Sequence, residues 1–481
     1  MLILLLACTP NLTPTDTDTQ GETGEALPSC ATEAGDLTTD QAASIIISNT
    51  ELETLDLGRG VSVCDLNGDG HGDLLVSGSH GPQRRGAIGV FYGPATDWPS
   101  EMDLSEADSL IQGSVDYTYL GISLDCGDLD GDGFADIVAT NAELLDTEIP
   151  ADTDSGVHIW YGSQDPLSAT LSELQADVSL HYDYGKPSAN RLYGMKVLVL
   201  DLDGDGQAEV SLATNESGAQ AGVRDRVFVL EGGRHTSGEL TESTSTIWGI
   251  EGSDISPSQI DLDGSGAGLL LSYRGARDPL ATILDSPLSL GTESYAEEEA
   301  WLSLEIGKST DRLLSPSSIQ GDSGPILVAP AADAQFTQAF LLVLKDLEEG
   351  YKLATDSHRT AISELQQVHI THVYAVGDYN GDGVEDLGVN LYHDPTSDDR
   401  FWALGVLDGS QLDTPDVALE SLLLNRVLLT ESNVNNGADQ GFSDLDGDGC
   451  SDLFWGEPYF GPAAPYAHDR GRVIVMLSTQ H

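Results

Sequence analysis

Short apolar stretches recur along the whole chain, and each is bounded by glycine and polar residues. Examples are GAIGVFYG at residues 86–93 and GRVIVMLS at residues 471–478. Runs of this length, either alternating or continuously apolar, are typical of β-strands. Helical periodicity is nearly absent. The pattern therefore predicts an all-β chain.

An acidic, glycine-containing string repeats between these stretches. It reads DLNGDGHGDLLV from Asp65, and its relatives begin at Asp128, Asp201, Asp261, Asp378 and Asp444. A degraded copy at residues 318–324 makes seven, spaced by 57 to 73 residues. Each interval has room for four strands and their loops. Radial repetition of such sheets is typical of propellers, so the repeat predicts a seven-bladed β-propeller.

The two ends of the chain supply a way to close the ring. The apolar residues 43–47 precede the first acidic loop at the distance at which residues 109–111 precede the second. The last repeat ends near residue 478 without such a strand. We therefore predict that the N-terminal strand completes the last blade, and that the propeller domain covers residues 42–481.

The acidic strings have the composition of calcium loops. In a nine-residue DxDxDGxxD loop, oxygen ligands fall at positions 1, 3, 5 and 9, and glycine at position 6 permits the turn. Oxygen-only ligation favours Ca²⁺ over transition metals. The five complete loops predict about five sites, with these ligands: Asp65, Asn67, Asp69 and Asp73; Asp128, Asp130, Asp132 and Asp136; Asp201, Asp203, Asp205 and Glu209; Asp378, Asn380, Asp382 and Asp386; Asp444, Asp446, Asp448 and Asp452.

Two further copies are incomplete. The fourth loop keeps Asp261 and Asp263 but has Ser265 and Leu269 at positions 5 and 9. The fifth has lost nearly all its ligands. We expect both to bind calcium weakly or not at all.

The competing interpretation is an EF-hand, whose loop ends in a bidentate glutamate at position 12 and lies between helices. Position 12 of the five complete loops holds residues that offer no carboxylate: Val76, Ala139, Leu212, Val389 and Trp455. The sequence therefore favours hairpin loops over EF-hands.

The order of strand, DxDGDGxxDLLV loop, variable loop and GxVYVFxG strand resembles the FG-GAP repeat of the integrin alpha N-terminal propeller and its bacterial relatives. The resemblance covers about residues 42–478. It implies structural calcium and an extracytoplasmic binding or adhesion role. It does not extend to the identity of the ligand.

The charge of the chain limits its partners. There are 80 acidic and 20 basic residues, giving a net charge of -60. Binding to phosphate backbones needs clustered lysine and arginine, so nucleic acid is not an expected partner. Anionic lipid headgroups are disfavoured for the same reason, and we expect membrane contact only through an N-terminal lipid.

The N-terminus MLILLLAC resembles the lipobox of bacterial lipoproteins. The resemblance implies a signal peptide at residues 1–7, lipidation of Cys8 and a place in the bacterial cell envelope, periplasmic or at the cell surface. Residues 8–41 are rich in Thr, Asp, Pro and Gly, which predicts a disordered tether. Four further cysteines allow three disulfide connectivities: Cys30, Cys64, Cys126 and Cys450.

No catalytic motif stands out. GDSGP at residues 321–325 lies in the degraded fifth loop, and the pair His369 and His372 has a spacing that points to opposite faces of a strand. We therefore expect a monomeric, non-enzymatic, calcium-stabilised scaffold that binds a protein or a glycan. The alternatives are an extracellular propeller hydrolase or lyase acting on polysaccharide, and a purely architectural envelope protein.

Overall fold

The computed structural model describes about three fifths of the chain. The described residues are 35–38, 42–47, 55–80, 83–114, 116, 118–141, 155–182, 196–214, 224–251, 254–260, 268–274, 281–284, 293–296, 302–305, 312–313, 317–321, 324–332, 339–344, 350–353, 359–362, 368–375, 379–380, 382, 384–393, 401–412, 418–421, 423–429, 440–448, 450–458 and 471–477. The predicted signal peptide and Cys8 lie outside them.

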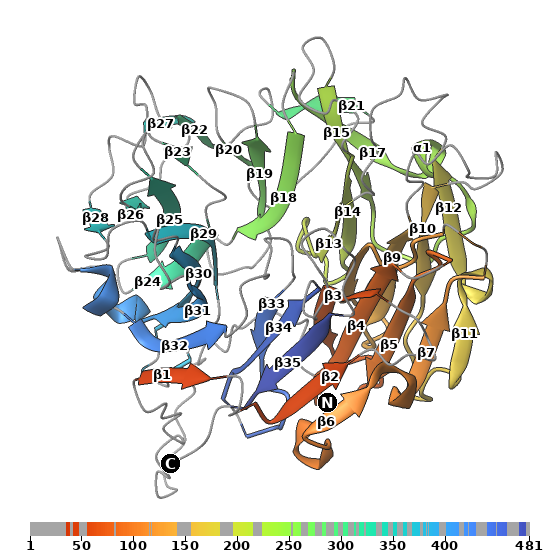
Figure 1. The fold of residues 1–481 in the computed structure, drawn as a ribbon. Coiled ribbons are helices and arrows are strands. Elements are labelled where there is room, and N and C mark those ends of the chain that lie inside the picture. Colours follow the sequence, from red (N-terminus) through yellow and green to blue (C-terminus); the bar gives the residue numbers. More distant parts are fainter. Residues whose placement is uncertain are drawn as a thin grey trace, which may run out of the picture.

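The described strands form seven sheets arranged around a common axis (Figure 1). We number the sheets in chain order. Sheets 1 to 3 contain β3 (Leu55–Cys64), β4 (Asp73–His80), β5 (Ala87–Phe91) and β7 (Ser109–Gln112); β8 (Ser123–Gly127), β9 (Asp136–Asn141), β10 (Ser155–Trp160) and β12 (Val178–Tyr182); and β13 (Lys196–Leu200), β14 (Glu209–Ala213), β15 (Arg224–Leu230) and β17 (Ser245–Glu251).

Sheets 4 to 7 repeat this order, with antiparallel neighbours and the first strand innermost. They contain β18 (Asp254–Ile260), β19 (Gly268–Arg274), β20 (Ala281–Leu284) and β22 (Leu302–Glu305); β24 (Ser317–Gly321), β25 (Gly324–Ala332), β26 (Ala339–Leu344) and β28 (Arg359–Ile362), with β23 (Arg312–Leu313) also on β25; β29 (Val368–Ala375), β30 (Leu387–His393), β31 (Phe401–Leu407) and β32 (Leu423–Leu429); and β33 (Gln440–Ser443), β34 (Asp452–Glu457), β35 (Arg472–Met476) and β2 (Ser44–Ile47).

The innermost strands follow one another around the axis. β3 contacts β8, and contacts then run from β8 through β13, β18 and β24 to β29, while β33 lies against β3 on its other side. Each apolar core cluster joins two neighbouring sheets; one, for example, packs Val157 and Leu180 of sheet 2 against Leu212 and Phe228 of sheet 3. The all-β and β-propeller predictions are confirmed.

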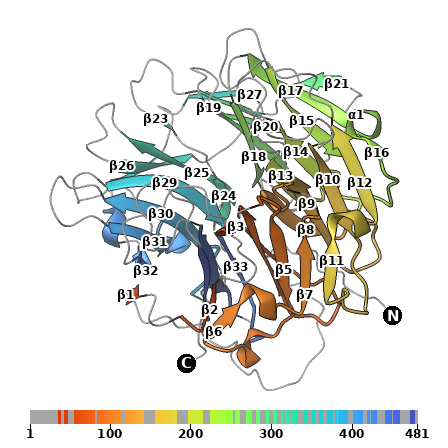
Figure 2. The same ribbon diagram turned by 45° about the vertical axis from the view of Figure 1, so that its right-hand side comes forward.

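Short outer strands add a fifth member to most sheets. Each comes from the next sheet along the chain and pairs in parallel with the outer strand, as β11 does with β7 (Figure 2). They are β6 (Glu101–Asp103), β11 (Thr170–Ser172), β16 (Gly238–Glu239), β21 (Glu293–Tyr295), β27 (Gly350–Leu353) and β1 (Gly35–Thr38). Because outer edges expose unpaired backbone groups, these strands protect them.

Helix is confined to single turns in the described residues. They are α1 (Leu240–Ser243) and the 3₁₀ turns η2 (Ala95–Asp97), η3 (Leu104–Glu106), η4 (Glu173–Gln175), η6 (Gly409–Gln411) and η7 (Leu419–Ser421). None of the helices in the described part of the chain is long and apolar enough to cross a membrane.

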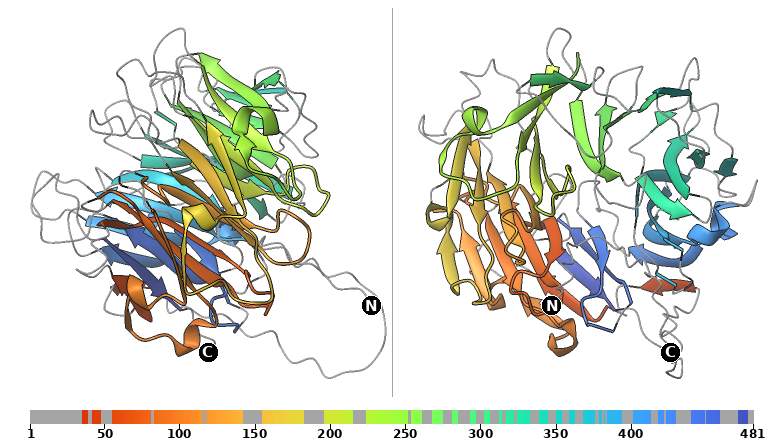
Figure 3. Two further views of the ribbon diagram at one scale, coloured as in Figure 1. Left: turned by 90° about the vertical axis from the view of Figure 1, so that its right-hand side faces the viewer. Right: turned by 180° about the vertical axis from the view of Figure 1, so that it is seen from behind.

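The N-terminal strand closes the ring as the sequence predicts. β2 pairs antiparallel with β35, so that Ile46 lies opposite Val473 and sheet 7 contains both ends of the domain. The right-hand view of Figure 3 shows β2 beside the C-terminal strands. At the same junction, Leu57 of β3 forms a parallel bridge to Gly471, as Leu120 does to Gly86 between sheets 1 and 2.

The predicted tether is too long by several residues. Gly35–Thr38 falls inside the segment that the sequence indicates to be disordered, yet it forms β1 and pairs with β32. β1 precedes β2 as β6 precedes β7, and each pairs with the outer strand of the preceding sheet. The edge of sheet 6 supplies backbone partners that a local composition rule does not take into account.

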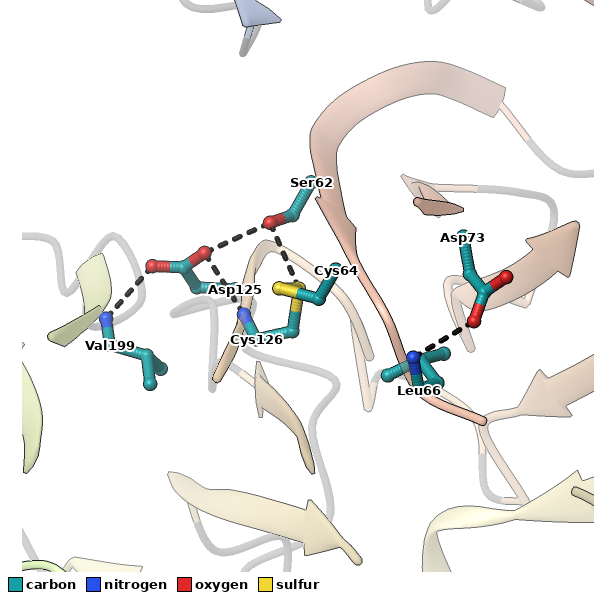
Figure 4. Close-up of a disulfide and its surroundings, with 7 residues drawn as sticks. All are labelled: Ser62, Cys64, Leu66, Asp73, Asp125, Cys126 and Val199. Carbon is teal, nitrogen blue, oxygen red and sulfur yellow. Dashed lines mark hydrogen bonds between the residues drawn. A yellow bond between two sulfur atoms is a disulfide. The ribbon is translucent and has the colours of Figure 1, made fainter. Parts of the chain in front are cut away.

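The innermost strands of sheets 1 to 3 are tied together by one carboxylate (Figure 4). Asp125 accepts hydrogen bonds from Ser62 Oγ at 3.0 Å, from its neighbour Cys126 N at 2.9 Å and from Val199 N at 2.8 Å. Burial raises the pKa of Asp125, and these donors oppose the rise. No sequence motif singled out this residue.

A disulfide joins Cys64 of sheet 1 to Cys126 of sheet 2 beside Asp125 (Figure 4). It selects one of the three connectivities that the sequence allows. Cys450 is also disulfide-bonded, to a partner outside the described residues. Disulfides are typical of oxidising, extracytoplasmic compartments.

We predict that Ile46→Ala destabilises the fold strongly, because Ile46 is fully buried in the strand that joins the two ends of the domain. Removing such a side chain costs about 3 kcal/mol in free energy of unfolding. Denaturant titration measures the loss. Leu174→Ala, at a side chain that is 78% exposed, is the control and should leave the midpoint unchanged. Equal midpoints for both variants would contradict the role of β2 in holding the two ends of the domain together.

One buried histidine makes stability depend on pH. His158 on β10 is 5% exposed, and burial lowers its pKa to about 4, with a smaller contribution from His181. An unfolded histidine titrates near 6.5, so between the two values the unfolded state binds the proton more tightly. Stability contributed by neutral His158 is therefore lost as pH falls from about 6.5 to 4.

We expect the wild-type protein to lose on the order of 3 kcal/mol more than a His158→Gln variant between pH 7 and pH 4, since each pKa unit corresponds to about 1.4 kcal/mol. Denaturant midpoints across this range measure the difference. Parallel pH profiles for the two proteins would contradict the prediction.

Candidate metal loops

The acidic loops connect the innermost strand of a sheet to its second strand. In sheet 1, Cys64 at the end of β3 pairs with Asp73 at the start of β4, so that residues 65–72 form the loop and Asp73, position 9 of the motif, begins the strand. Position 9 is thus the first residue of the second strand in sheets 1, 2, 3 and 7, and in sheet 6 it directly precedes that strand. Its carboxylate is at most 5% exposed in all five complete loops: Asp73, Asp136, Glu209, Asp386 and Asp452.

Each of these buried carboxylates is held by backbone N–H groups. Asp73 accepts from Leu66 N and from Gly93 N, both at 2.9 Å. Asp136, Glu209 and Asp386 repeat the pair, with donors at position 2 of the loop and at the glycine after the third strand. Every oxygen that accepts one such bond retains a lone pair for a cation.

The glycine after the third strand is a part of the loop that sequence reasoning missed. A Cβ at Gly93 would lie 2.6 Å from the carbonyl oxygen of Gly72, and one at Gly162 would lie 2.2 Å from that of Ala135. A side chain there would push the strand end away from the position-9 carboxylate. The recurring ends FYG, WYG, LEG and LDG carried this signal.

The first ligand organises the turn. Asp65 accepts from the N–H groups of Gly68, Asp69 and Gly70, at 2.7 to 3.1 Å. Gly68 and Gly70 have φ of 72° and 89°, a region that favours glycine. Glycine is therefore required at position 4 as well as at position 6. Asp128 makes the corresponding bonds in the second loop.

Three loops bring carboxylate oxygens close enough to share one ion. Oxygens from positions 1, 3 and 9 lie within 4.8 Å of one another in these groups: Asp128, Asp130 and Asp136; Asp201, Asp203 and Glu209; Asp444, Asp446 and Asp452. The first loop folds with the same hydrogen bonds but has Asn67 at position 3. Negative charge crowded this closely is destabilising unless a proton or a cation offsets it.

The electrostatic cost is largest at position 9. The pKa of Asp73, Asp136, Glu209 and Asp386 is raised to about 7 in each case, mainly by burial. The neighbouring loop aspartates contribute to the rise, and the backbone donors oppose it. A bound divalent cation would stabilise the charged form of these groups. The donor set, all oxygen and with a flexible geometry, fits Ca²⁺.

The remaining copies differ from this pattern. In the sixth repeat, Asn380, Asp382 and Asp386 are described, and Asp378 lies outside the described residues. In sheet 5, Gly321 pairs with Gly324, so only two residues separate the paired strands, which is too few for the acidic loop of the complete copies. The fourth loop, residues 261–267, lies outside the described part of the chain.

The EF-hand alternative is wrong. Position 12 of each complete loop lies within the second strand of its sheet and is at most 1% exposed, so it faces the apolar core instead of the loop: Val76, Ala139, Leu212, Val389 and Trp455.

Neighbouring loops touch one another around the axis. Ala135 N in the second loop donates to Asp65 O in the first at 2.9 Å, and Ala208 N in the third donates to Asp128 O at 2.7 Å. Ala95 N of sheet 1 likewise donates to Leu445 O in the last loop at 2.6 Å. The last, first, second and third loops thus form a continuous arc on one face of the ring.

Two segments of the chain match the model of the FG-GAP repeat, residues 57–91 and 441–476. Both contain an innermost strand, an acidic loop and the two strands that follow. Integrin alpha-4 from Xenopus laevis is 27% identical over 179 residues, which is 36% of this chain and 16% of that protein. Phosphatidylinositol-glycan-specific phospholipase D from Rattus norvegicus is 27% identical over 164 residues, which is 33% of this chain and 18% of that protein.

Three solved structures share features of the arrangement at low similarity. They are an alpha-L-arabinanase from Penicillium chrysogenum (12% identity, TM-score 0.40, 75% of this chain and 96% of that one), an alpha-L-arabinofuranosidase from Fusarium graminearum (8%, 0.40, 78% and 99%) and the Dos1 propeller (9%, 0.39, 91% and 95%). Likeness at this level says nothing about the activity of this chain.

The matched segments coincide with the strands and loops described above, and the aligned regions cover less than a fifth of either curated relative. The chain carries FG-GAP repeats on a β-propeller, and integrin alpha chains are among its homologues.

Proposed function

We propose that the chain is a seven-bladed, calcium-stabilised scaffold outside the cytoplasm that binds a protein or a glycan. The observation that carries the proposal is the buried position-9 carboxylate, which is repeated in five loops and in three of them lies close to carboxylate oxygens of positions 1 and 3. A fold that buries such a charge repeatedly gains stability when a cation reaches it.

The calcium ions would be held by the four ligand positions of each complete loop. When bound, Ca²⁺ supplies positive charge and fixes the loop; the chain's own groups do the rest. The N–H groups of position 2 and of the glycine after the third strand orient the position-9 carboxylate, as Leu66 and Gly93 orient Asp73. The loop-to-loop contacts then make the stability of one sheet depend on that of its neighbour.

A binding role is favoured by what the two curated relatives have in common. One is named as an integrin chain and the other as a phospholipase, yet each aligns with this chain over a region of similar length. A region present in proteins of different activity is better explained as a scaffold than as the source of the chemistry.

The location we propose is the bacterial cell envelope, with lipidation at Cys8 and the tether as a spacer. The Cys64–Cys126 disulfide and the integrin homologue favour an extracellular or surface protein. Metabolic labelling with a fatty-acid probe tests the anchor: Cys8→Ser should abolish labelling, whereas Cys30→Ser should not.

We expect the purified domain to hold about five calcium ions and to lose melting temperature on chelation. At a free calcium concentration of 100 times Kd, each site stabilises the fold by about 2.7 kcal/mol. Metal analysis and paired thermal melts in calcium and chelator measure both. Asp136→Ala should remove one ion, while Asp116→Ala, at an exposed side chain, is the charge-matched control.

Absence of bound calcium together with an unchanged melt would contradict the calcium assignment.

The binding role has its own test. A screen of glycans and envelope proteins in the presence of calcium should identify a ligand that the protein binds and leaves chemically unchanged. Release of reducing sugar from a polysaccharide would instead favour the hydrolase or lyase alternative.

A further inference from the structure

One loop ligand already faces a positive charge from the neighbouring sheet. Arg234, which follows β15 of sheet 3, reaches the second loop, where its Nε lies 2.6 Å from Asp130 Oδ2 and its Nη2 lies 3.4 Å from Asp132 Oδ2. Asp130 and Asp132 are positions 3 and 5 of that loop. The side chain of Asp130 is 3% exposed, so the ion pair occupies a ligand that water hardly reaches.

The arginine is positioned by several contacts. Its guanidinium carbon lies 4.6 Å from the centre of the Tyr161 ring, a cation–π distance. On either side of it, Gly233 N donates to Leu129 O in the second loop at 2.5 Å, and His235 N donates to Tyr161 Oη at 2.8 Å. The segment from Gly233 to His235 is thus fastened to sheet 2.

The other repeats that have a glycine after the third strand carry no cation at this position. Arg234 is the second residue after Gly232, the glycine that follows the third strand of sheet 3. The residue at the same position is Ala95 in sheet 1, Gln164 in sheet 2 and Gln411 in sheet 6. The backbone contact to the preceding loop is kept in sheet 1, where Ala95 N donates to Leu445 O at 2.6 Å. The backbone contact to the preceding loop is therefore common to sheets 1 and 3, and the positive charge of Arg234 is an addition found in sheet 3.

A guanidinium and a divalent cation on the same carboxylates repel each other, and the repulsion is stronger where one carboxylate is shielded from water. Arg234 also offsets the crowded negative charge of the loop when no ion is bound. We propose, on the basis of the calcium function proposed above, that Arg234 is a built-in competitor of Ca²⁺ that makes the second loop the weakest of the complete loops.

Calcium entry into this loop then requires Arg234 to leave Asp130. The first, third and last loops fill at lower calcium concentration than the second. Because Arg234 belongs to sheet 3 and Asp130 to sheet 2, the late-filling loop also changes a contact between sheets. The ring accordingly keeps one loop that responds to calcium in a range where its neighbours are already saturated.

The test compares Arg234→Gln with the wild-type protein, because glutamine is the residue that the second and sixth repeats carry at this position. Hydrogen–deuterium exchange of the peptide spanning residues 128–136, followed across a calcium titration, gives the affinity of the second loop alone. We expect its midpoint to fall at least about tenfold in calcium concentration in Arg234→Gln, with the peptides of the first and third loops unchanged.

Two further variants separate this effect from general electrostatics. Arg85→Gln removes the same charge from an exposed pair with Asp116, away from the loops, and should leave the second loop's midpoint unchanged. Gln164→Arg places a guanidinium above the first loop and should weaken that loop instead. In chelator, Arg234→Gln should melt below the wild-type protein, and in saturating calcium the difference should vanish or reverse.

An unchanged midpoint for the second loop in Arg234→Gln would overturn the inference while leaving the calcium function intact. If neither the wild-type protein nor the variant binds calcium, the proposed function itself fails. A lower melting temperature of the variant in both calcium and chelator, with no change in midpoint, would show a purely structural ion pair and also overturn it.

Discussion

The structure depends on a carboxylate buried at the start of the second strand of five sheets. Asp73, Asp136, Glu209 and Asp386 each take backbone hydrogen bonds from two directions, and burial is the main cause that raises their pKa values to about 7. One donor comes from the loop and the other from the end of the third strand. The carboxylate therefore fixes the loop, the second strand and the third strand relative to one another.

This arrangement gathers the loop carboxylates at one end of the sheets. Neighbouring sheets pack through clusters of Val, Leu and Ile, and close approaches are made by glycine, as where Gly58 of β3 lies against Gly456 of β34. At the charged end, the loops contact one another through backbone bonds from sheet 7 to sheet 3. The conformation of one loop and the packing between sheets are thus physically connected.

The connection also explains why one added side chain matters. The residues that follow the third strands of sheets 1 and 3 contact the preceding loop, so a substitution there acts on the neighbouring sheet as well as on its own. Arg234 uses this position to bring a charge to Asp130. Asp125 and the Cys64–Cys126 disulfide act in the same region from the inner side, where they hold sheets 1 to 3 together.

Periodicity in the sequence determined the strands, the repeat, the positions of the loop carboxylates and the use of residues 43–47 to close the ring. Each of these features depends on the spacing of residues that are close together in the sequence. Tertiary structure alone decided the remainder. β1 formed in a polar segment since the edge of sheet 6 offered partners, Cys64 paired with Cys126 because adjacent inner strands place them together, and Arg234 met Asp130 from another sheet. Contacts between residues far apart along the chain could not be predicted from the sequence, because they produce no local pattern of residues.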